Sequence, residues 1–217
     1  AWQEKVITSN AKRSLIPYLK SRGVAKIDQL VLTTSQPKQL DHLLEISKSF
    51  NLGEILVTEE TLSKREFMDK LRESNLKVRP IKTGERLFVF GSSLEVIATQ
   101  DKDKNDSIAM YGKLLNQTFL VTRNIEENSL TSYYPKLQAD VVITHQQSSK
   151  KKTDVEVFKT LQPKITVMSV DKKKRFKEKN GELNQEDKEV ENTIYKTDKK
   201  GALRFKGWSS WKIETVH

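Results

Sequence analysis

The first eighty residues alternate between short apolar runs rich in β-forming residues and segments with helical spacing, and this alternation constrains the fold most. The expected helices are 10–23, 39–50 and 61–74, and the expected strands are 30–33, 54–57 and 78–81. Ser9 or Asn10 can cap the first helix, Gly23 can take the left-handed position that follows it, and Pro17 predicts a kink inside it. Strand–helix–strand units of this kind predict a layered α/β domain.

From Leu87 onward the pattern changes to hairpins and then to further strands. The expected strands are 87–90, 94–98, 108–115, 118–122, 141–143, 165–168, 193–195, 202–205 and 211–216. Turns are expected at Gly91-Ser92-Ser93 and at Asn116-Gln117, and helices at 126–134, 155–161 and 181–191. A mixed sheet is the consequence. Because domains typically have roughly 100–200 residues, we expect a single domain over 1–217.

The positive charge is concentrated in the last third of the chain. The formal net charge is +10, and the segment 145–217 holds 18 Lys/Arg against 11 Asp/Glu, compared with 21 against 18 before it. Such a surplus can attract phosphate backbones or anionic lipid headgroups. The alternative is a solvated lysine-rich face without a partner.

Several chemistries are excluded by residue type. The sequence has no cysteine, so it has no disulfide, thiolate metal site or cysteine nucleophile. It also lacks a P-loop, a dinucleotide-binding glycine motif and a nucleophile elbow. No apolar run approaches the ~18 residues that cross a bilayer, and the start does not have the pattern of a signal peptide. We therefore expect a water-soluble domain.

Many short sequence words, in one order from about Ser9 to the end, resemble the metallo-β-lactamase-like domain of the bacterial competence DNA-uptake channel family ComEC, in its streptococcal form. They include Leu15-Ile16-Pro17-Tyr18-Leu19, Phe90-Gly91-Ser92, Tyr111-Gly112-Lys113-Leu114-Leu115, Phe119-Leu120-Val121-Thr122, Gln162-Pro163-Lys164-Ile165 and Gly201-Ala202-Leu203-Arg204-Phe205-Lys206-Gly207-Trp208.

The resemblance implies an α/β sandwich of two mixed β-sheets flanked by helices, with metal ligands on loops at the strand edge. It also implies a soluble domain of a cytoplasmic-membrane protein, on the extracellular side, with the remainder of the channel protein as a partner. Family members usually begin with further strands before the position of Trp2, so we expect an N-terminally truncated fold. A sheet edge left open in this way invites pairing, and a homodimer is one expectation.

The resemblance further implies a two-metal site for Zn or Mn, built from His and Asp, and this sequence departs from that pattern. Imidazole and carboxylate suit these ions, and the pair of ions makes a hydroxide nucleophile. The matching positions are Thr34, Gln36, Lys38 and Gln39 in the first ligand segment, Asn124 in the second, and Gln146 and Gln147 in the third. The three histidines, His42, His145 and His217, form no ligand pair. We expect no metal, no cofactor, no catalytic residue and no zinc-dependent nuclease activity.

Basic segments follow two of the expected strands, beside the position of the family's metal cleft. The expected DNA-binding residues are Lys150, Lys151, Lys152, Lys172, Lys173, Lys174, Arg175 and Lys177. Three interpretations stay open: an inactive domain that guides or binds DNA, a structural remnant that supports the channel, and a nuclease that degrades one DNA strand with an unseen arrangement. The salt dependence of DNA binding separates the first from the second.

Overall fold

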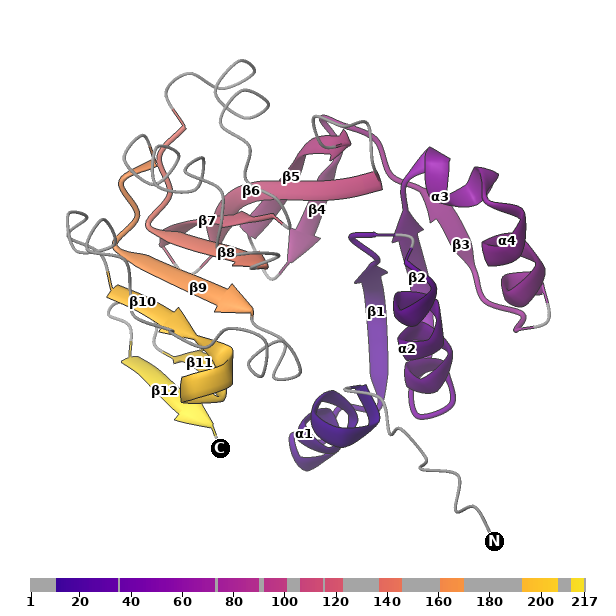
Figure 1. Ribbon diagram of the computed structural model, residues 1–217, viewed down its shortest axis with the longest axis horizontal. Helices are drawn as coiled ribbons and strands as arrows, with labels where there is room; N and C mark the ends of the chain where they lie inside the picture. Colours follow the sequence, from indigo (N-terminus) through magenta and orange to yellow (C-terminus); the bar gives the residue numbers. More distant parts are fainter. Residues whose placement is uncertain are drawn as a thin grey trace, which may run out of the picture. The chain divides into compact units, whose positions relative to one another are not determined.

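The computed structural model describes ten stretches of the chain, which are 11–34, 36–72, 74–89, 92–100, 106–114, 116–122, 137–145, 161–169, 193–206 and 212–216. The chain divides into two compact units, Ala1–Ile81 and Lys82–His217, and each is described by itself (Figure 1). The expectation of a single domain over 1–217 stays a prediction.

The first unit has a three-stranded parallel sheet with the order β1-β2-β3. The strands are β1 (Lys26–Val31), β2 (Asn51–Val57) and β3 (Val78–Pro80). The helical segments are η1 (Ala11–Leu15, a π-helical turn), α1 (Ile16–Ser21), α2 (Pro37–Ser47), α3 (Glu59–Ser63) and α4 (Arg65–Arg72). This succession of parallel strands and helices confirms the α/β pattern that the spacing predicted.

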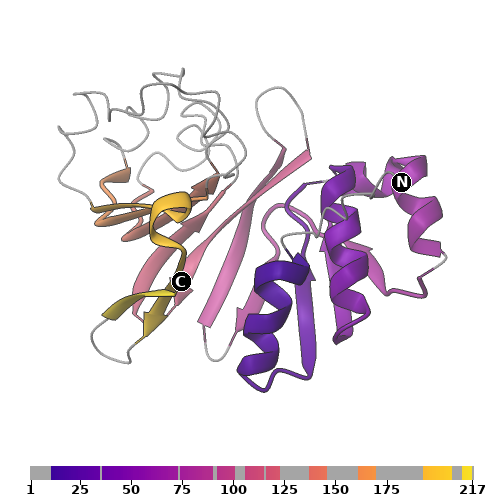
Figure 2. The same ribbon diagram turned by 60° about the horizontal axis from the view of Figure 1, so that its bottom comes forward.

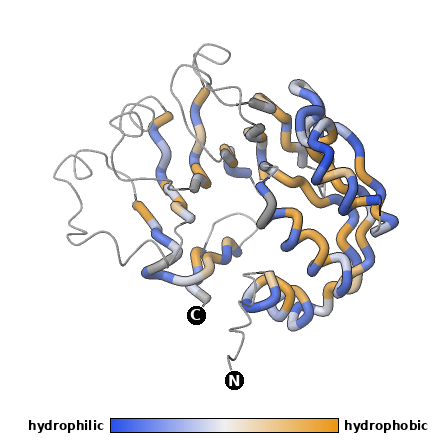
Figure 3. The backbone as a smooth tube through the Cα atoms, turned by 45° about the vertical axis from the view of Figure 1, so that its right-hand side comes forward, coloured by the Kyte–Doolittle hydropathy of each residue, from blue (hydrophilic) through white to orange (hydrophobic). Residues whose placement is uncertain are grey.

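The apolar sides of α2 and α4 form one core with the sheet. Their buried side chains are Leu40 and Leu43 from α2, and Phe67 and Leu71 from α4. These residues pack with Ile55 and Val57 of β2, which are fully buried. Figure 2 shows helices running alongside the strands of this unit, and the tube in Figure 3 shows hydrophobic and hydrophilic residues alternating along them. The apolar positions whose spacing predicted the helices are therefore the positions whose side chains are buried against the sheet.

Strand boundaries in the first unit differ from the prediction. The first strand begins at Lys26 rather than Leu30, and the second at Asn51 rather than Glu54, because the main chains pair from Lys26↔Asn51 onward. Exposed polar residues such as Asp28 carry the early part of β1, so the apolar pattern did not indicate it. Backbone pairing, and not apolar content, sets these ends.

The predicted helix 61–74 is wrong as a single element. Thr58 caps α3 by accepting a hydrogen bond from the Thr61 amide at 3.1 Å, and the extended Lys64 separates α3 from α4. The Lys64 carbonyl oxygen accepts from the Met68 amide at 3.1 Å, which makes Lys64 the start of the second helix.

At the first helix the prediction at Gly23 fits the structure, and the kink expected at Pro17 stays a prediction. Pro17 lies in the first turn of α1, directly after the π-helical turn, a position at which a helix tolerates proline. Gly23 has φ +70°, in the left-handed region.

The second unit contains a seven-stranded mixed sheet with the order β10-β9-β8-β7-β6-β5-β4. The strands are β4 (Arg86–Val89), β5 (Ser92–Gln100), β6 (Asp106–Leu114), β7 (Gln117–Val121), β8 (Val141–His145), β9 (Ile165–Ser169) and β10 (Thr193–Lys196). Strands β4 to β7 pair antiparallel, and β7 to β10 pair parallel. The short helix α7 (Thr197–Lys200) and the hairpin of β11 (Ala202–Lys206) and β12 (Lys212–Val216) complete this unit.

The hairpins of the second unit were predicted with one error. Ser92 and Ser93 belong to β5, where they pair with Val89 and Phe88, so the predicted turn Gly91-Ser92-Ser93 is wrong in extent. Two residues, 90 and 91, connect β4 to β5. At the next hairpin Asn116 has φ 64°, which fits the predicted turn because asparagine tolerates the left-handed region.

Some expected elements were not tested, and one element was missed. The helices expected at 126–134 and 181–191, and nearly all of the helix expected at 155–161, lie outside the described residues. Helix α7 was not predicted, since its four residues are too few to show a period.

The fold class is α/β, as expected, and the described strands form one parallel sheet, one mixed sheet and a small antiparallel hairpin. Among the described helices, none is long and apolar enough to cross a membrane. The expected homodimer stays a prediction.

Candidate functional site

The first ligand segment of the resemblance lies between β1 and α2. After β1 ends at Val31, Leu32 still donates its amide to the Leu56 carbonyl at 2.9 Å, and Thr34 is buried. Gln36 is extended and exposed, and its carbonyl accepts from the Gln39 amide at 2.8 Å. The segment therefore becomes the first turn of α2, with Gln36 as its N-cap and Gln39 as its third helical residue.

The donor set of this segment does not fit Zn or Mn. It offers a buried hydroxyl at Thr34, amides at Gln36 and Gln39, and a lysine at position 38, whereas these ions prefer imidazole and carboxylate. The next carboxylate along the chain, Asp41, faces the ammonium of Lys70 at 3.7 Å. Across the described part of the chain, no group of three or more His, Cys, Asp or Glu side chains is placed to hold a metal ion.

The second and third segments begin at one edge of the seven-stranded sheet. Because β7, β8, β9 and β10 run parallel, their carboxyl ends lie at the same edge. Buried Thr122 follows β7 and donates its amide to the Ile143 carbonyl at 2.9 Å. His145 is the last residue of β8 and pairs with Ser169, the last residue of β9. Carboxyl ends of parallel strands are where α/β sheets place their ligands.

Most of the predicted site residues continue from this edge but lie outside the described residues. They are Asn124, Gln146, Gln147, Lys150, Lys151, Lys152, Lys172, Lys173, Lys174, Arg175 and Lys177. The described strand ends place the start of three segments next to one another: the one after Thr122, the one after His145 and the one after Ser169. Whether the lysines themselves converge stays a prediction.

A polar cluster at the opposite edge holds the parallel strands in register. Asp140, just before β8, accepts from the amide of Thr118 at 2.9 Å and from its hydroxyl at 2.8 Å. The amide of Asp140 donates back to the Thr118 hydroxyl at 2.9 Å, and the Lys164 ammonium lies 2.8 Å from the second carboxylate oxygen. Three chain segments are thereby tied at the amino ends of β7, β8 and β9.

The electrostatics of this cluster follow from its hydrogen bonds. Partial burial acts to raise the pKa of Asp140, but the bonds from Lys164 and from the amide and hydroxyl of Thr118 outweigh it and hold the pKa at about 2. The Tyr111 hydroxyl donates to the Gln138 carbonyl at 2.9 Å, and burial together with the Asp140 charge raises the pKa of Tyr111. The cluster is charged at neutral pH and lies away from the strand ends that lead to the predicted site.

One charged feature among the described residues was missed by the sequence reasoning. On the β11–β12 hairpin, Glu214 accepts from the Arg204 guanidinium at 2.6 Å and from the Lys206 ammonium at 3.1 Å. The sequence predicted strands at 202–205 and 211–216, but the register that pairs Arg204 with Glu214 and Lys206 with Lys212 could not be derived from the spacing of residues. The alternation of cations with apolar residues was the available signal.

Comparison with solved structures defines the class of protein. YhfI from Bacillus subtilis, a metallo-β-lactamase fold protein, aligns with a TM-score of 0.59 and 12% identity over 87% of this chain and 81% of its own. An isothiocyanate hydrolase from Delia radicum gut bacteria aligns with a TM-score of 0.51 and 11% identity over 78% of this chain and 73% of its own. The chain is therefore an α/β protein with a metallo-β-lactamase fold.

Comparison of sequences adds a particular relative, although no family model matches. ComE operon protein 3 of Bacillus subtilis (strain 168) is 21% identical over 216 residues, which is 94% of this chain. This similarity confirms the resemblance to ComEC that the sequence words indicated. The alignment covers 28% of that relative, so this chain spans little more than a quarter of its length.

Proposed function

We propose that this chain is a catalytically inactive metallo-β-lactamase-type domain of a competence channel protein, and that it guides or binds transforming DNA without sequence preference. The basic segments 150–152 and 172–177 make the contact. The parent protein lies in the cytoplasmic membrane, with this domain on the extracellular side. The similarity to ComE operon protein 3 supports the competence context.

The observation that carries the loss of catalysis is the donor set between β1 and α2. A two-metal hydrolase needs imidazole and carboxylate ligands for its pair of ions, and neither Thr34 nor Gln39 supplies one. The Gln36 carbonyl is also engaged in the first turn of α2. Nuclease activity through a different arrangement is the competing function, and metal-dependent nicking of plasmid DNA by the pure protein would establish it.

DNA contact is supported by charge and by the strand ends. Between Lys150 and Lys179 the sequence holds 11 Lys/Arg against 4 Asp/Glu. The segments that contain these lysines follow β8 and β9, which are neighbours in the sheet. Several lysines on phosphates give non-specific dissociation constants of roughly 10⁻⁴–10⁻⁶ M at physiological salt.

The test replaces Lys150, Lys151 and Lys152 by Glu in one variant, and Lys172, Lys173 and Lys174 by Glu in another. In a DNA retardation assay, the affinity of each variant for DNA should be at least tenfold lower than that of the wild type at ~50 mM salt, a condition that favours electrostatic binding. The matched control replaces three exposed lysines elsewhere, Lys48, Lys77 and Lys113, by Glu, and it should bind as the wild type does. Absence of binding by the wild type would leave the structural remnant as the function.

A further inference from the structure

One face of the β11–β12 hairpin gathers positive charge. Strand residues alternate between faces, and the register pairs Arg204 with Glu214 and Lys206 with Lys212. These four residues therefore share a face. Phe205 lies on the opposite face, where its ring packs edge-on against Phe119 of β7, with centroids 6.0 Å apart. The charged face is thus the one turned away from the sheet.

The charges on this face are not balanced by one another. Glu214 holds both Arg204 and Lys206, at 2.6 and 3.1 Å. Lys212 stands directly opposite Lys206, and both ammonium groups are exposed. Like charges in directly opposed positions destabilise a sheet. Among the described acidic side chains none pairs with Lys212. The stability of the hairpin does not account for these lysines, whereas an anionic ligand would.

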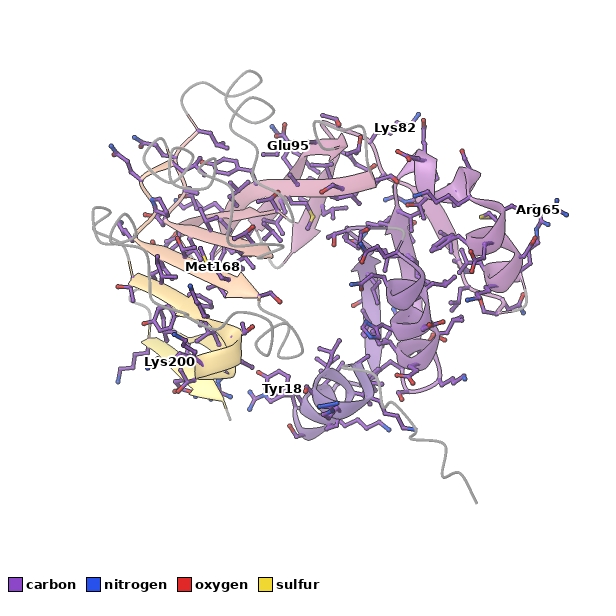
Figure 4. The ribbon with its side chains drawn as sticks, in the orientation of Figure 1. Tyr18, Arg65, Lys82, Glu95, Met168 and Lys200 are labelled. Atoms are coloured by element: carbon purple, nitrogen blue, oxygen red, sulfur yellow. The ribbon has the colours of Figure 1, made fainter. Side chains whose placement is uncertain are left out.

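Helix α7, which directly precedes β11 in the chain, adds two lysines next to the hairpin. Lys199 and Lys200 are exposed at its end, and the helix lies against β10 and β11. Figure 4 labels Lys200 beside the hairpin. Hydrogen bonds from Arg204 and Lys206 lower the pKa of Glu214, so this carboxylate is charged at neutral pH. The sequence of α7, β11 and β12 therefore holds five cations (Lys199, Lys200, Arg204, Lys206 and Lys212) and two acidic residues, Asp198 and Glu214.

We propose that the outward face of β11–β12, together with α7, binds the phosphodiester backbone of nucleic acid. It acts as a second contact region, made of residues other than the loop lysines. The choice of nucleic acid as the ligand rests on the proposed function. The positive charge of the face follows from the strand register and does not depend on that function. A row of cations along two strands suits a backbone that carries one charge per nucleotide, and such contacts need no base recognition.

The first test replaces Lys199, Lys206 and Lys212 by Gln and measures the fluorescence anisotropy of a labelled single-stranded 20-mer. Binding should weaken at least tenfold at ~50 mM salt. The slope of log K against log salt should fall by about 2, since each phosphate neutralised on a single strand contributes ~0.7. Arginine at the same three positions should keep binding near the wild-type level. The matched control Lys48, Lys77 and Lys113→Gln should leave both quantities unchanged.

The second test removes the carboxylate. Glu214→Gln leaves every cation in place and removes one negative charge from the face, so binding should tighten by about eightfold at ~50 mM salt. A purely structural role of Glu214 cannot produce tighter binding.

Trp208 and Trp211, two of the three tryptophans of the chain, are in the connection between β11 and β12. In a Trp2→Phe background, tryptophan fluorescence should therefore change as the oligonucleotide saturates the protein.

The outcomes separate this proposal from the proposed function. If the loop variants lose binding while the Gln variant and Glu214→Gln bind as the wild type does, the hairpin proposal is overturned and the loop assignment stands. If only the hairpin variants change, the loop assignment fails and the hairpin proposal stands. Binding to phosphatidylserine vesicles without binding to the oligonucleotide would overturn both.

Discussion

Asp140 is a single carboxylate that ties three strands, and its contribution to stability depends on pH. Its pKa is about 2 in the fold against 3.8 as the ordinary value. The stabilisation is therefore complete above about pH 4 and is lost as the pH falls through about 2. Asp140 is 25% exposed and its partner Lys164 is 73% exposed, which reduces the effect.

Asp140→Asn should lower the free energy of unfolding by about 1–2 kcal/mol at pH 7. Urea unfolding at several pH values should show the difference from the wild type shrinking between pH 4 and pH 2. A difference that stays constant over this range would show that the charge of Asp140 does not matter.

Gln39 tests the ligand segment at the same scale. Gln39→His places one imidazole at the third residue of α2, and one imidazole cannot supply a two-metal site. Micromolar Zn or Mn should therefore leave the Tm of this variant, and of the wild type, unchanged within about 1 °C, since a ligand stabilises only as it occupies the native state. A rise of several degrees in either protein would contradict the expected loss of metal binding.

Gly112 shows what a single element requires. It lies in β6 opposite Leu94 and Phe119, and a side-chain carbon there would overlap the carbonyl oxygen of Ser93 in β5. Gly112→Ala should therefore force β5 and β6 apart and lower the free energy of unfolding by about 1–3 kcal/mol. The neighbouring exposed position provides the control, because Lys113→Ala should stay within about 0.5 kcal/mol of the wild type. Equal urea midpoints for the two variants would refute the close approach.

The elements show which parts of a sequence pattern can be trusted. The buried strands β8 and β9 were predicted almost to their ends, because their apolar residues are contiguous. The early half of β1 was missed, since exposed Lys26, Asp28 and Gln29 carry it and only pairing with β2 makes it a strand. The break at Lys64 was missed as well, because the apolar spacing continues across it from Thr61 to Leu71. The local apolar pattern of a sequence therefore indicates which residues are buried, whereas pairing with distant segments decides where a strand begins and ends.

For the candidate site, the sequence could identify the altered ligand positions but not the surroundings that the fold gives them. Residue types alone predict that Thr34, Lys38 and Gln39 do not replace His and Asp as metal ligands, and this stays a prediction. That Gln36 and Gln39 begin a helix, and that Lys206 faces Lys212, depends on register and hydrogen bonding that a single sequence does not contain.

At the scale of the whole molecule, we predict that residues 1–217 unfold as one domain. The likeness to YhfI covers 87% of this chain, which is more than either compact unit contains. Differential scanning calorimetry should therefore give one transition with equal calorimetric and van't Hoff enthalpies. Two resolved transitions would instead mean that Ala1–Ile81 and Lys82–His217 are separate domains.

The central claim is that contact with DNA persists in a metallo-β-lactamase fold that has lost its metal site. The most direct measurement is a titration of labelled DNA followed by anisotropy at ~50 mM salt, once in EDTA and once with Mn and Zn. The account predicts micromolar binding that is the same in both conditions, falls steeply with added salt, and leaves the DNA intact. Binding that requires the metal, or cleavage of the DNA when the metal is present, would contradict it.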